Sequence, residues 1–444
     1  MKKTILGLFV VLCSSMLHAQ ERWTFEQCIA YAIEHNAQVK KAAIANKEYE
    51  IRLNTAQNSR LPDMNAMLGQ NVYFGRGPSR DGTYKDNTQL STTMNATANL
   101  TVFAAGRIKH DIQGRRFDLQ AAMQDLQRAR EDLSLNVTSM FLQVLFCKEL
   151  IVVAQKQVEL SRTLVERNEL LLKGGRSVEA ELLESQASLS NDELNLANTE
   201  NDLTLALLDL SQALNRSTAD GFDIEPPTMD SITHDAVQGL MLPGSVFDLA
   251  VESRPMVKAE ELRLKSSLQS LRTAQSARYP QIALSGGYSN SYFYSFVAGY
   301  NNVGFLHQLR NNGNEFIGLN ISIPVFNRLA TRNQIRSARA NVELQEVVLS
   351  ETKQALRKEI EQAYYNVKIA YKKYNTSEKS FESAKAAFDY EAERASAGRS
   401  NMYDYNEAKM RMEKAESNML QAKYELIFNR KILDFYAGQP LTLQ

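Results

Sequence analysis

The chain is duplicated along nearly its whole length, and this repeat constrains the fold more than any other feature of the sequence. Residues 32–40, AIEHNAQVK, match residues 250–258, AVESRPMVK, at an offset of 218. Farther along, the offset becomes 223 and aligns the GRS at Gly175 with the GRS at Gly398. Collinear matches of this kind indicate two tandem structural repeats, so both halves are expected to adopt the same fold.

Each repeat predicts the same order of helices and strands. A helix of about 25 residues comes first and ends before a proline, because the residue that precedes a proline disfavours the helical backbone. Two strand-like segments follow, then a helical stretch of about 68 residues and a last helix of about 37 residues. In the first repeat these elements are expected at 36–60, 63–103, 104–171 and 178–214, and in the second at 254–278, 281–326, 329–396 and 401–437.

The two repeats are joined by a segment with the composition of a linker. Residues 215–245 contain Pro226-Pro227 and several glycines and aspartates, which favour turns and loops. The chain is therefore divided into a first repeat at 20–214, this inter-repeat segment, and a second repeat at 246–444.

The strand-like segments alternate between an apolar face and a small-polar face. About ten residues per strand with this alternation is typical of the wall of a transmembrane β-barrel. A soluble β-sandwich is the alternative, and only four such strands disfavour it. The expected apolar face comprises Leu90, Met94, Ala96, Ala98, Leu100, Val102, Ile282, Leu284, Tyr288, Tyr292, Tyr294, Ile317, Leu319, Ile321 and Ile323. The aromatic residues expected at the membrane interface are Tyr73, Phe74, Tyr292, Phe293, Tyr294 and Phe296.

The N-terminus predicts export from the cytoplasm. Residues 1–19 combine Lys2 and Lys3 with a short apolar run and a small residue at Ala19, the pattern of a signal peptide. No later run of about 18 apolar residues is evident, so entry into a membrane is expected through the strands. Lys plus Arg equal Asp plus Glu at 51 each, which gives no charge excess for nucleic acid.

Four strands are too few to close a barrel, since single-chain barrels begin at about eight. Several chains must then share one barrel, with eight strands from two chains or twelve from three. A helix of 68 residues is about 100 Å long and must project from the membrane. The two shorter helices of each repeat together match that length, so the turns KGGRS and SAGRS are expected at the far end. A soluble trimeric coiled-coil stalk would explain the helices without explaining the strands.

The chain resembles the TolC-type outer-membrane factor family, also called outer membrane efflux proteins. The resemblance rests on the signal peptide, the duplication, the order of elements, residues 23–36 (WTFEQCIAYAIEHN) and the strand exit ISIPVFNR. The first repeat reads NLTVFAAGR there and lacks the proline. The resemblance implies a mostly α chain with a transmembrane β portion. It implies a homotrimer whose twelve-stranded barrel, four strands per chain, lies in outer-membrane lipid. A long periplasmic α-helical barrel would continue it, with residues 215–245 in an equatorial girdle.

No feature of the sequence predicts an enzyme or a cofactor. The histidines, His18, His35, His110, His234 and His307, form no metal-binding spacing, and no GxxxxGK[ST] motif is present. Methionines at 402, 410, 412 and 419 could suggest export of a soft metal, but a helix packing face explains them more simply. The expected function is therefore passive conduction, with a structural or adhesive outer-membrane stalk as the alternative.

Acidic residues follow both GRS turns at the same spacing. Glu181 and Glu184 lie six and nine residues after Gly175, and Asp404 and Glu407 follow Gly398 likewise. Residues three apart share a helix face. The resemblance places these four at a narrowed periplasmic mouth, where rings of carboxylates would favour cations. The alternative is that these acids offset the helix dipole. This suits the positions six residues after the glycines better than the positions nine residues after them.

The turns themselves are expected to meet a partner. Glycine permits the backbone that ends a helix, and serine can cap the next helix. The resemblance implies that the turns dock a periplasmic adaptor that couples the duct to an inner-membrane pump of the RND or ABC type. The predicted docking residues are Gly174, Gly175, Arg176, Ser177, Gly398, Arg399 and Ser400.

Overall fold

A computed structural model describes residues 21–78, 82–227, 239–397 and 399–443. The predicted signal peptide, part of the inter-repeat segment and Gly398 lie outside the described residues. The fold has two compact units, and each takes segments from both repeats. The first, called the helical unit here, comprises the described residues of 1–44, 124–258 and 350–444. The second, the sheet unit, comprises those of 45–123 and 259–349.

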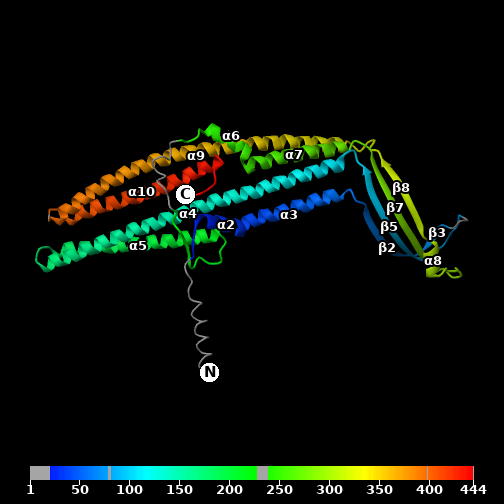
Figure 1. The fold of residues 1–444 in the computed structure, drawn as a ribbon. Coiled ribbons are helices and arrows are strands. Elements are labelled where there is room, and N and C mark those ends of the chain that lie inside the picture. Colours follow the sequence, from blue (N-terminus) through cyan, green and yellow to red (C-terminus); the bar gives the residue numbers. More distant parts are fainter. Residues whose placement is uncertain (1–20, 79–81, 228–238, 398, 444) are drawn as a thin grey trace, which may run out of the picture. The chain divides into compact units, whose positions relative to one another are not determined.

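The helices repeat along the chain in the register that the sequence predicts (Figure 1). The first two helices of the second repeat begin and end 218 residues after their counterparts, and the two longer ones 223 residues after. The helices of the first repeat are α2 (Phe25–His35), α3 (Ala37–Asn58), α4 (Arg107–Lys173) and α5 (Glu179–Ala213). Those of the second are α6 (Pro243–Ser253), α7 (Pro255–Ser276), α9 (Ala330–Ser396) and α10 (Met402–Tyr436).

The sheet unit contains an antiparallel sheet in the order β2-β5-β7-β8. Its strands are β2 (Asp63–Tyr73), β5 (Gln89–Phe103), β7 (Gln281–Ser295) and β8 (Asn314–Ser322). The register sets Met64 beside Ala98, Ala98 beside Gly286, and Gly286 beside Ile317. Successive side chains alternate between faces, so this row puts the predicted apolar residues of β5, β7 and β8 on one face. Met64, Ala66 and Leu68 of β2, which were not predicted, lie on the same face.

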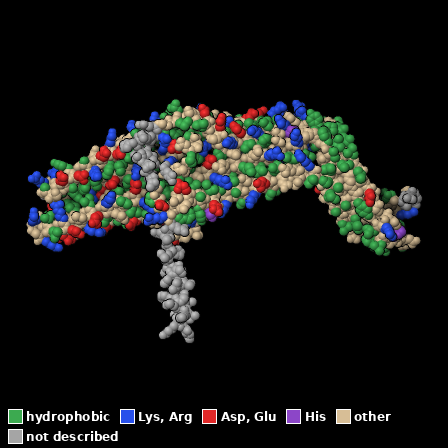
Figure 2. Space-filling view, in the orientation of Figure 1, with side chains coloured by type: hydrophobic (Ala, Val, Ile, Leu, Met, Phe, Trp, Pro, Cys, Tyr) green, Lys and Arg blue, Asp and Glu red, His purple; other side chains and the backbone are tan. Residues whose placement is uncertain are grey.

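That apolar face is exposed in the single chain. Ile317 is 87% exposed and Leu68 is 71% exposed. Figure 2 shows hydrophobic side chains gathered over the sheet, with charged side chains spread over the helices. An apolar patch of this kind marks a surface that another protein or a membrane covers.

The segments expected to hold only strands also contain smaller elements. The short strands β3 (Arg76–Pro78) and β4 (Tyr84–Asp86) form a separate hairpin, and helix α8 (Phe305–Asn311) follows β7. β7 continues to Ser295, beyond its last pair with β8 at Ser289 and Asn314. There, amide side chains bond backbone groups of β7 that β8 does not reach. Gln308 accepts from the Phe293 N–H at 3.0 Å and donates to the Phe293 carbonyl at 2.8 Å. Asn302 pairs with the backbone of Ser295 in the same way, at 2.7 and 2.8 Å.

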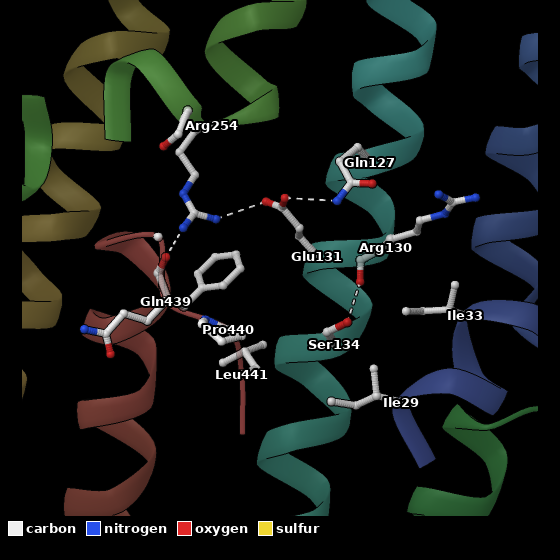
Figure 3. A pocket seen from close by; sticks show the side chains of 13 residues that line it. Ile29, Ile33, Gln127, Arg130, Glu131, Ser134, Arg254, Gln439, Pro440 and Leu441 are labelled. Carbon is white, nitrogen blue, oxygen red and sulfur yellow. Dashed lines mark hydrogen bonds and ion pairs between the residues drawn. The ribbon is translucent and has the colours of Figure 1, made fainter. Parts of the chain in front are cut away.

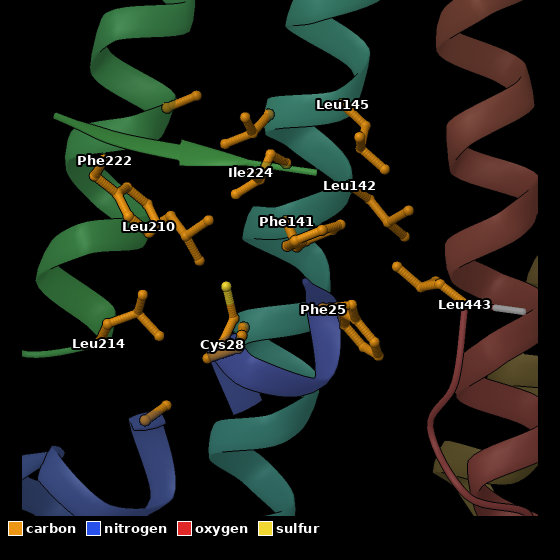
Figure 4. Packing of buried hydrophobic residues seen from close by; sticks show 14 of the residues in the cluster. Phe25, Cys28, Phe141, Leu142, Leu145, Leu210, Leu214, Phe222, Ile224 and Leu443 are labelled. Atoms are coloured by element: carbon orange, nitrogen blue, oxygen red, sulfur yellow. The ribbon is translucent and has the colours of Figure 1, made fainter. Parts of the chain in front are cut away.

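The helical unit is built on a core that joins segments far apart in the sequence (Figure 4). Phe141 of α4 is fully buried and meets Phe25 of α2 edge-on at 5.3 Å between ring centroids. Leu210 of α5, Ile224 and Leu443 from the C-terminal tail are buried in the same cluster. Part of α4 reaches a mean hydropathy of 1.8, a level that membrane helices share, but half of it is buried inside the protein. Core packing therefore accounts for its apolar character.

The described part of the inter-repeat segment contributes to this core. Strand β6 (Phe222–Ile224) pairs in parallel with β1 (Glu21–Trp23). Lys148 of α4 donates to the Ile224 carbonyl at 2.8 Å. The segment is thus fixed by backbone pairing and burial, which its linker-like composition does not predict.

The core position of Phe141 gives the first prediction. Phe141→Ala should lower the free energy of unfolding by about 3–5 kcal/mol, because it removes a large buried ring and leaves a cavity. Chemical denaturation followed by helical circular dichroism measures the change. Ser139→Ala, at an exposed position on the same helix, should stay within about 0.5 kcal/mol of the parent protein. Equal effects of the two substitutions would contradict the core assignment.

Candidate functional site

The first hairpin turn ends α4 with a glycine in the left-handed backbone conformation. Gly175 has φ +69°, and its N–H bonds the Leu172 carbonyl at 2.9 Å. The Arg176 N–H bonds the Leu171 carbonyl at 2.8 Å. This pair of bonds is the Schellman motif, which satisfies the last carbonyls of a helix. Gly175 is therefore required by backbone geometry whatever else the turn does.

The second turn repeats the outer bond of the first. The Arg399 N–H bonds the Arg394 carbonyl at 2.9 Å, and the Arg394 guanidinium returns a bond of 3.1 Å to the Arg399 carbonyl. Arg167 of α4 donates to the carbonyls of Ala395 and Ser396 at 3.1 and 3.0 Å. The end of α9 is thus tied to the other hairpin of the same unit.

The expectation that the serines cap the following helices is wrong. The N-cap of α5 is Val178, without a side-chain bond, and the N-cap of α10 is Asn401, which accepts from the Asp404 N–H at 2.7 Å. Ser177 instead donates to the Glu181 carboxylate at 2.5 Å. Ser400 donates to the Glu391 carboxylate, and this bond lowers the pKa of Glu391. Each serine lies one position too early to cap.

The two arginines of the turns are free to meet a partner. Arg176 and Arg399 are exposed, and neither guanidinium bonds another described residue. Backbone bonds already satisfy carbonyls at the ends of α4 and α9, and Gly175 supplies the left-handed backbone at the first turn. The two positions therefore present positive charge at the turns without an evident structural duty.

The structure brings two of the four predicted mouth acids together. Glu184 and Glu407 line one cavity of about 500 Å³ between α5 and α10. Glu407 also pairs with Arg411 at 2.5 Å, which partly offsets its charge. Glu181 and Asp404 do not line this cavity, and both lie in the first turn of their helices, where they also offset the helix dipole.

The same cavity is bordered by a buried charge cluster that the sequence did not reveal. Lys409 of α10 is 2% exposed and bonds the carboxylate of Asp192 on α5. It also donates to Ser161 of α4 at 2.5 Å and lies 3.5 Å from Glu413. A buried ammonium is tolerated only when it is paired and hydrogen-bonded, so this cluster links three helices through Lys409. No local pattern in the sequence identifies this cluster, because Lys409 and Asp192 lie 217 residues apart.

Burial raises the pKa of Glu413 to about 7, although Lys409 acts in the opposite direction. A carboxyl with a raised pKa binds more protons in the folded protein than in the unfolded chain. It therefore stabilises the fold below the pKa of the unfolded chain, and this contribution is lost as the pH rises through the folded pKa. The sensitive window is from about pH 4.5 to pH 7.

A second open cavity of about 680 Å³ lies between α2, α4, the α6–α7 junction and the C-terminal tail (Figure 3). Arg254, 8% exposed, bonds Glu131 at 3.1 Å and also bonds the Phe435 carbonyl at the end of α10. Its counterpart, Asn36, bonds the Ala213 carbonyl at the end of α5 at 3.0 Å. Both residues have extended backbone and break a helix in two. Arg254 thus links the break between α6 and α7 to the end of α10.

The described residues include no cluster of three or more His, Cys, Asp or Glu side chains that could hold a metal ion.

Comparisons with known proteins point to one family. The family model described as outer membrane efflux protein matches residues 28–216 and again residues 246–439. No curated protein sequence matches the chain.

Among solved structures, CusC is 17% identical with a TM-score of 0.76, covering 94% of this chain and 92% of its own. VceC of Vibrio cholerae is 16% identical with a TM-score of 0.76, and the coverages are 94% and 97%. CmeC of Campylobacter jejuni, an outer membrane channel, is 16% identical with a TM-score of 0.74, and the coverages are 93% and 85%. At these identities the likeness establishes the fold.

The buried acid predicts the pH dependence of stability. The parent protein should lose up to about 3 kcal/mol from pH 4.5 to pH 7.5 through Glu413, from a shift of about 2.5 units. Glu413→Gln, which is neutral and nearly isosteric, should flatten this dependence and be the more stable form at pH 7.5. Thermal midpoints of both proteins across this range measure the difference. Parallel curves would show that Glu413 ionises freely.

Proposed function

Since the chain belongs to the outer membrane efflux protein family, we propose that it is the passive exit duct of a tripartite efflux or type I export system. The protein is located in the outer membrane and extends into the periplasm. Docking of a periplasmic adaptor and an inner-membrane pump, of the RND or ABC type, opens the duct.

The observation that carries the proposal is the incomplete sheet. Within the described residues, β2 pairs only with β5 and β8 pairs only with β7, so both edges are free. The apolar face suits lipid, but free backbone groups at a sheet edge are too costly there. Closure with strands of other copies satisfies the edges and encloses a passage.

Three copies suit a duct better than two. The interior of an eight-stranded barrel is largely filled by its own side chains. Twelve strands from a homotrimer leave room for cargo. Helices such as α4 and α9, 67 residues each and about 100 Å long, continue the passage as a helical barrel.

The two repeats and the segment between them take distinct places in this duct. Residues 1–19 are the signal peptide, residues 20–214 and 246–444 are the repeats, and residues 215–245 are the equatorial segment. The matched helix bounds support the two repeats. The burial of Phe222 and Ile224 supports an ordered girdle rather than a loose linker.

The narrow end of the duct lies at the acidic residues after the turns. Glu184 and Glu407 already share a cavity, and Glu181 and Asp404 lie one helical turn closer to the turns. Three copies give stacked rings of carboxylates, which attract cations and retard anions. The exposed Arg176 and Arg399, with the glycines and serines beside them, form the adaptor-docking surface.

Conductance in planar bilayers tests the duct. The purified protein should give single-channel currents that favour cations. Combined substitution of Glu181, Glu184, Asp404 and Glu407 by Ala should lower the cation-to-anion permeability ratio several-fold, because the carboxylate rings are gone. Glu50→Ala, which removes an exposed acid of α3, is the matched control and should leave the ratio unchanged.

The outcomes separate a duct from a stalk. Absence of any current from correctly assembled protein, with and without the substitutions, would leave the structural or adhesive stalk as the better description. If the protein conducts but the alanine substitutions leave the permeability ratio unchanged, the duct is supported and the acidic mouth is contradicted.

The docking surface gives a separate prediction. Arg176→Glu combined with Arg399→Glu should weaken adaptor binding by about tenfold or more and reduce export from cells. The bilayer conductance of the variant should be unchanged, because neither side chain supports the helix ends. Arg→Lys at both positions keeps the charge and serves as the control. Normal adaptor binding by the Glu variant would exclude the arginines from docking.

A further inference from the structure

Helix α8 lies at the end of the sheet that is farther from the long helices. Strand β7 begins at Gln281, shortly after α7 ends at Ser276, and it runs away from that helix to Ser295. The segment that contains α8 follows at this far end, before β8 returns (Figure 1). In a barrel whose helices extend into the periplasm, this end of the sheet is the extracellular one.

Helix α8 packs on the apolar face of the sheet. Asn290 of β7 pairs with Met94 of β5, so its side chain lies on that face, and it donates to the Leu309 carbonyl of α8 at 2.6 Å. Tyr292, two residues later on the same face, meets Phe305 of α8 edge-on at 5.0 Å between ring centroids. The helix therefore lies against the face that the proposed duct turns toward lipid.

The burial of Asn290 gives this contact a structural reason. Asn290 is 4% exposed, although Ile317 on the same face is 87% exposed. Its side-chain amide also donates to the Tyr288 hydroxyl at 2.8 Å. An amide that faces hydrocarbon without hydrogen bonds is costly. Helix α8 thus covers a polar position of the wall.

Side-chain amides hold α8 in this place. Besides its two bonds to the backbone of Phe293, Gln308 donates to the Val303 carbonyl at 2.8 Å. Asn312 donates to the Ser291 carbonyl at 2.6 Å. These bonds turn the amides of the segment toward β7.

The part of α8 that β7 does not cover is largely apolar. Leu306 is 78% exposed, and Phe305 and Val303 are 44% and 47% exposed. Arg310 lies one helical turn after Leu306, is exposed, and its guanidinium bonds no described residue. Exposed apolar side chains with a cation beside them are typical of a helix that lies in a membrane interface.

We propose that α8 lies in the outer leaflet of the outer membrane, against the outside of the barrel wall, with Leu306 and Phe305 among acyl chains and Arg310 at an anionic lipid headgroup. This inference rests on the proposed duct, because it requires the apolar face of the sheet to meet lipid. Lipid is the occupant because the bare part of α8 continues that face, and arginine suits a headgroup phosphate. The helix is thereby held beside the barrel and does not cover its opening.

Quenching of fluorescence by lipid tests the position of α8. The chain has one tryptophan, Trp23, which belongs to the helical unit. Leu306→Trp adds a reporter at an exposed position. In vesicles of phosphatidylcholine brominated along its acyl chains, the added emission should be quenched about twofold or more, because an interfacial helix buries its apolar side at the acyl boundary. The parent protein should be quenched little. Leu319→Trp, at an exposed position on the apolar face of β8, is the matched reporter for the wall and should be quenched as well.

The headgroup contact is tested with the Leu306→Trp reporter. A lipid held by Arg310 brings its bromines close to residue 306, one helical turn away. Brominated phosphatidylglycerol should therefore quench this reporter about twofold more than brominated phosphatidylcholine does. Adding Arg310→Gln should abolish the preference, and Arg310→Lys, which keeps the charge, should retain it. Equal quenching by the two lipids, or a preference that survives Arg310→Gln, would overturn the headgroup contact.

The outcomes separate this inference from the duct itself. Lipid quenching at residues 306 and 319 supports both. Lipid quenching at residue 319, with residue 306 reached only by a water-soluble quencher such as iodide, overturns the placement of α8 and leaves the duct. Absence of lipid quenching at both positions, in protein that is folded by circular dichroism, overturns the placement together with the lipid-facing sheet on which the duct depends.

Discussion

The unpaired edges of the four-stranded sheet are the constraint on which the rest of the structure depends. A sheet with one largely apolar face belongs in lipid, where water cannot satisfy a free backbone group. The chain resolves part of this problem internally, since Gln308 and Asn302 bond the part of β7 that lies beyond the first residue of β8. The outer edges of β2 and β8 have no partner strand among the described residues.

The duplication determines the order and length of the helices in each half of the chain. The sequence differences between the two repeats determine which interactions occur at only one of two equivalent positions. The helices repeat residue for residue, and Asn36 and Arg254 clasp equivalent helix ends. By contrast, Lys409 has Gln186 as its counterpart, so the buried ammonium of the second repeat has no equivalent at this position of the first.

Much of the fold follows from local patterns in the sequence. The long helices end within three residues of the expected bounds, as for α4 at Arg107–Lys173 against 104–171. Period-two alternation identified the apolar face correctly, because it depends on the strand alone. Helix α8 was missed because side-chain amides, rather than a periodic pattern, hold it in place. The serine caps were assigned wrongly by a single position.

The candidate site was less accessible to sequence reasoning. The spacing of acids after the turns found Glu184 and Glu407, which the fold brings together. It could not find the bond between Lys409 and Asp192, whose members lie 217 residues apart and look like ordinary charges of a solvated helix. Long-range pairing of this kind is decided by packing between helices, which no local pattern encodes.

The number of chains in the assembly is the most direct test of the central claim that separate copies close the sheet. Native mass spectrometry of the protein released from detergent micelles should give the mass of three chains and no stable monomer. A monomer, or an assembly whose strands cannot complete a barrel, would contradict it.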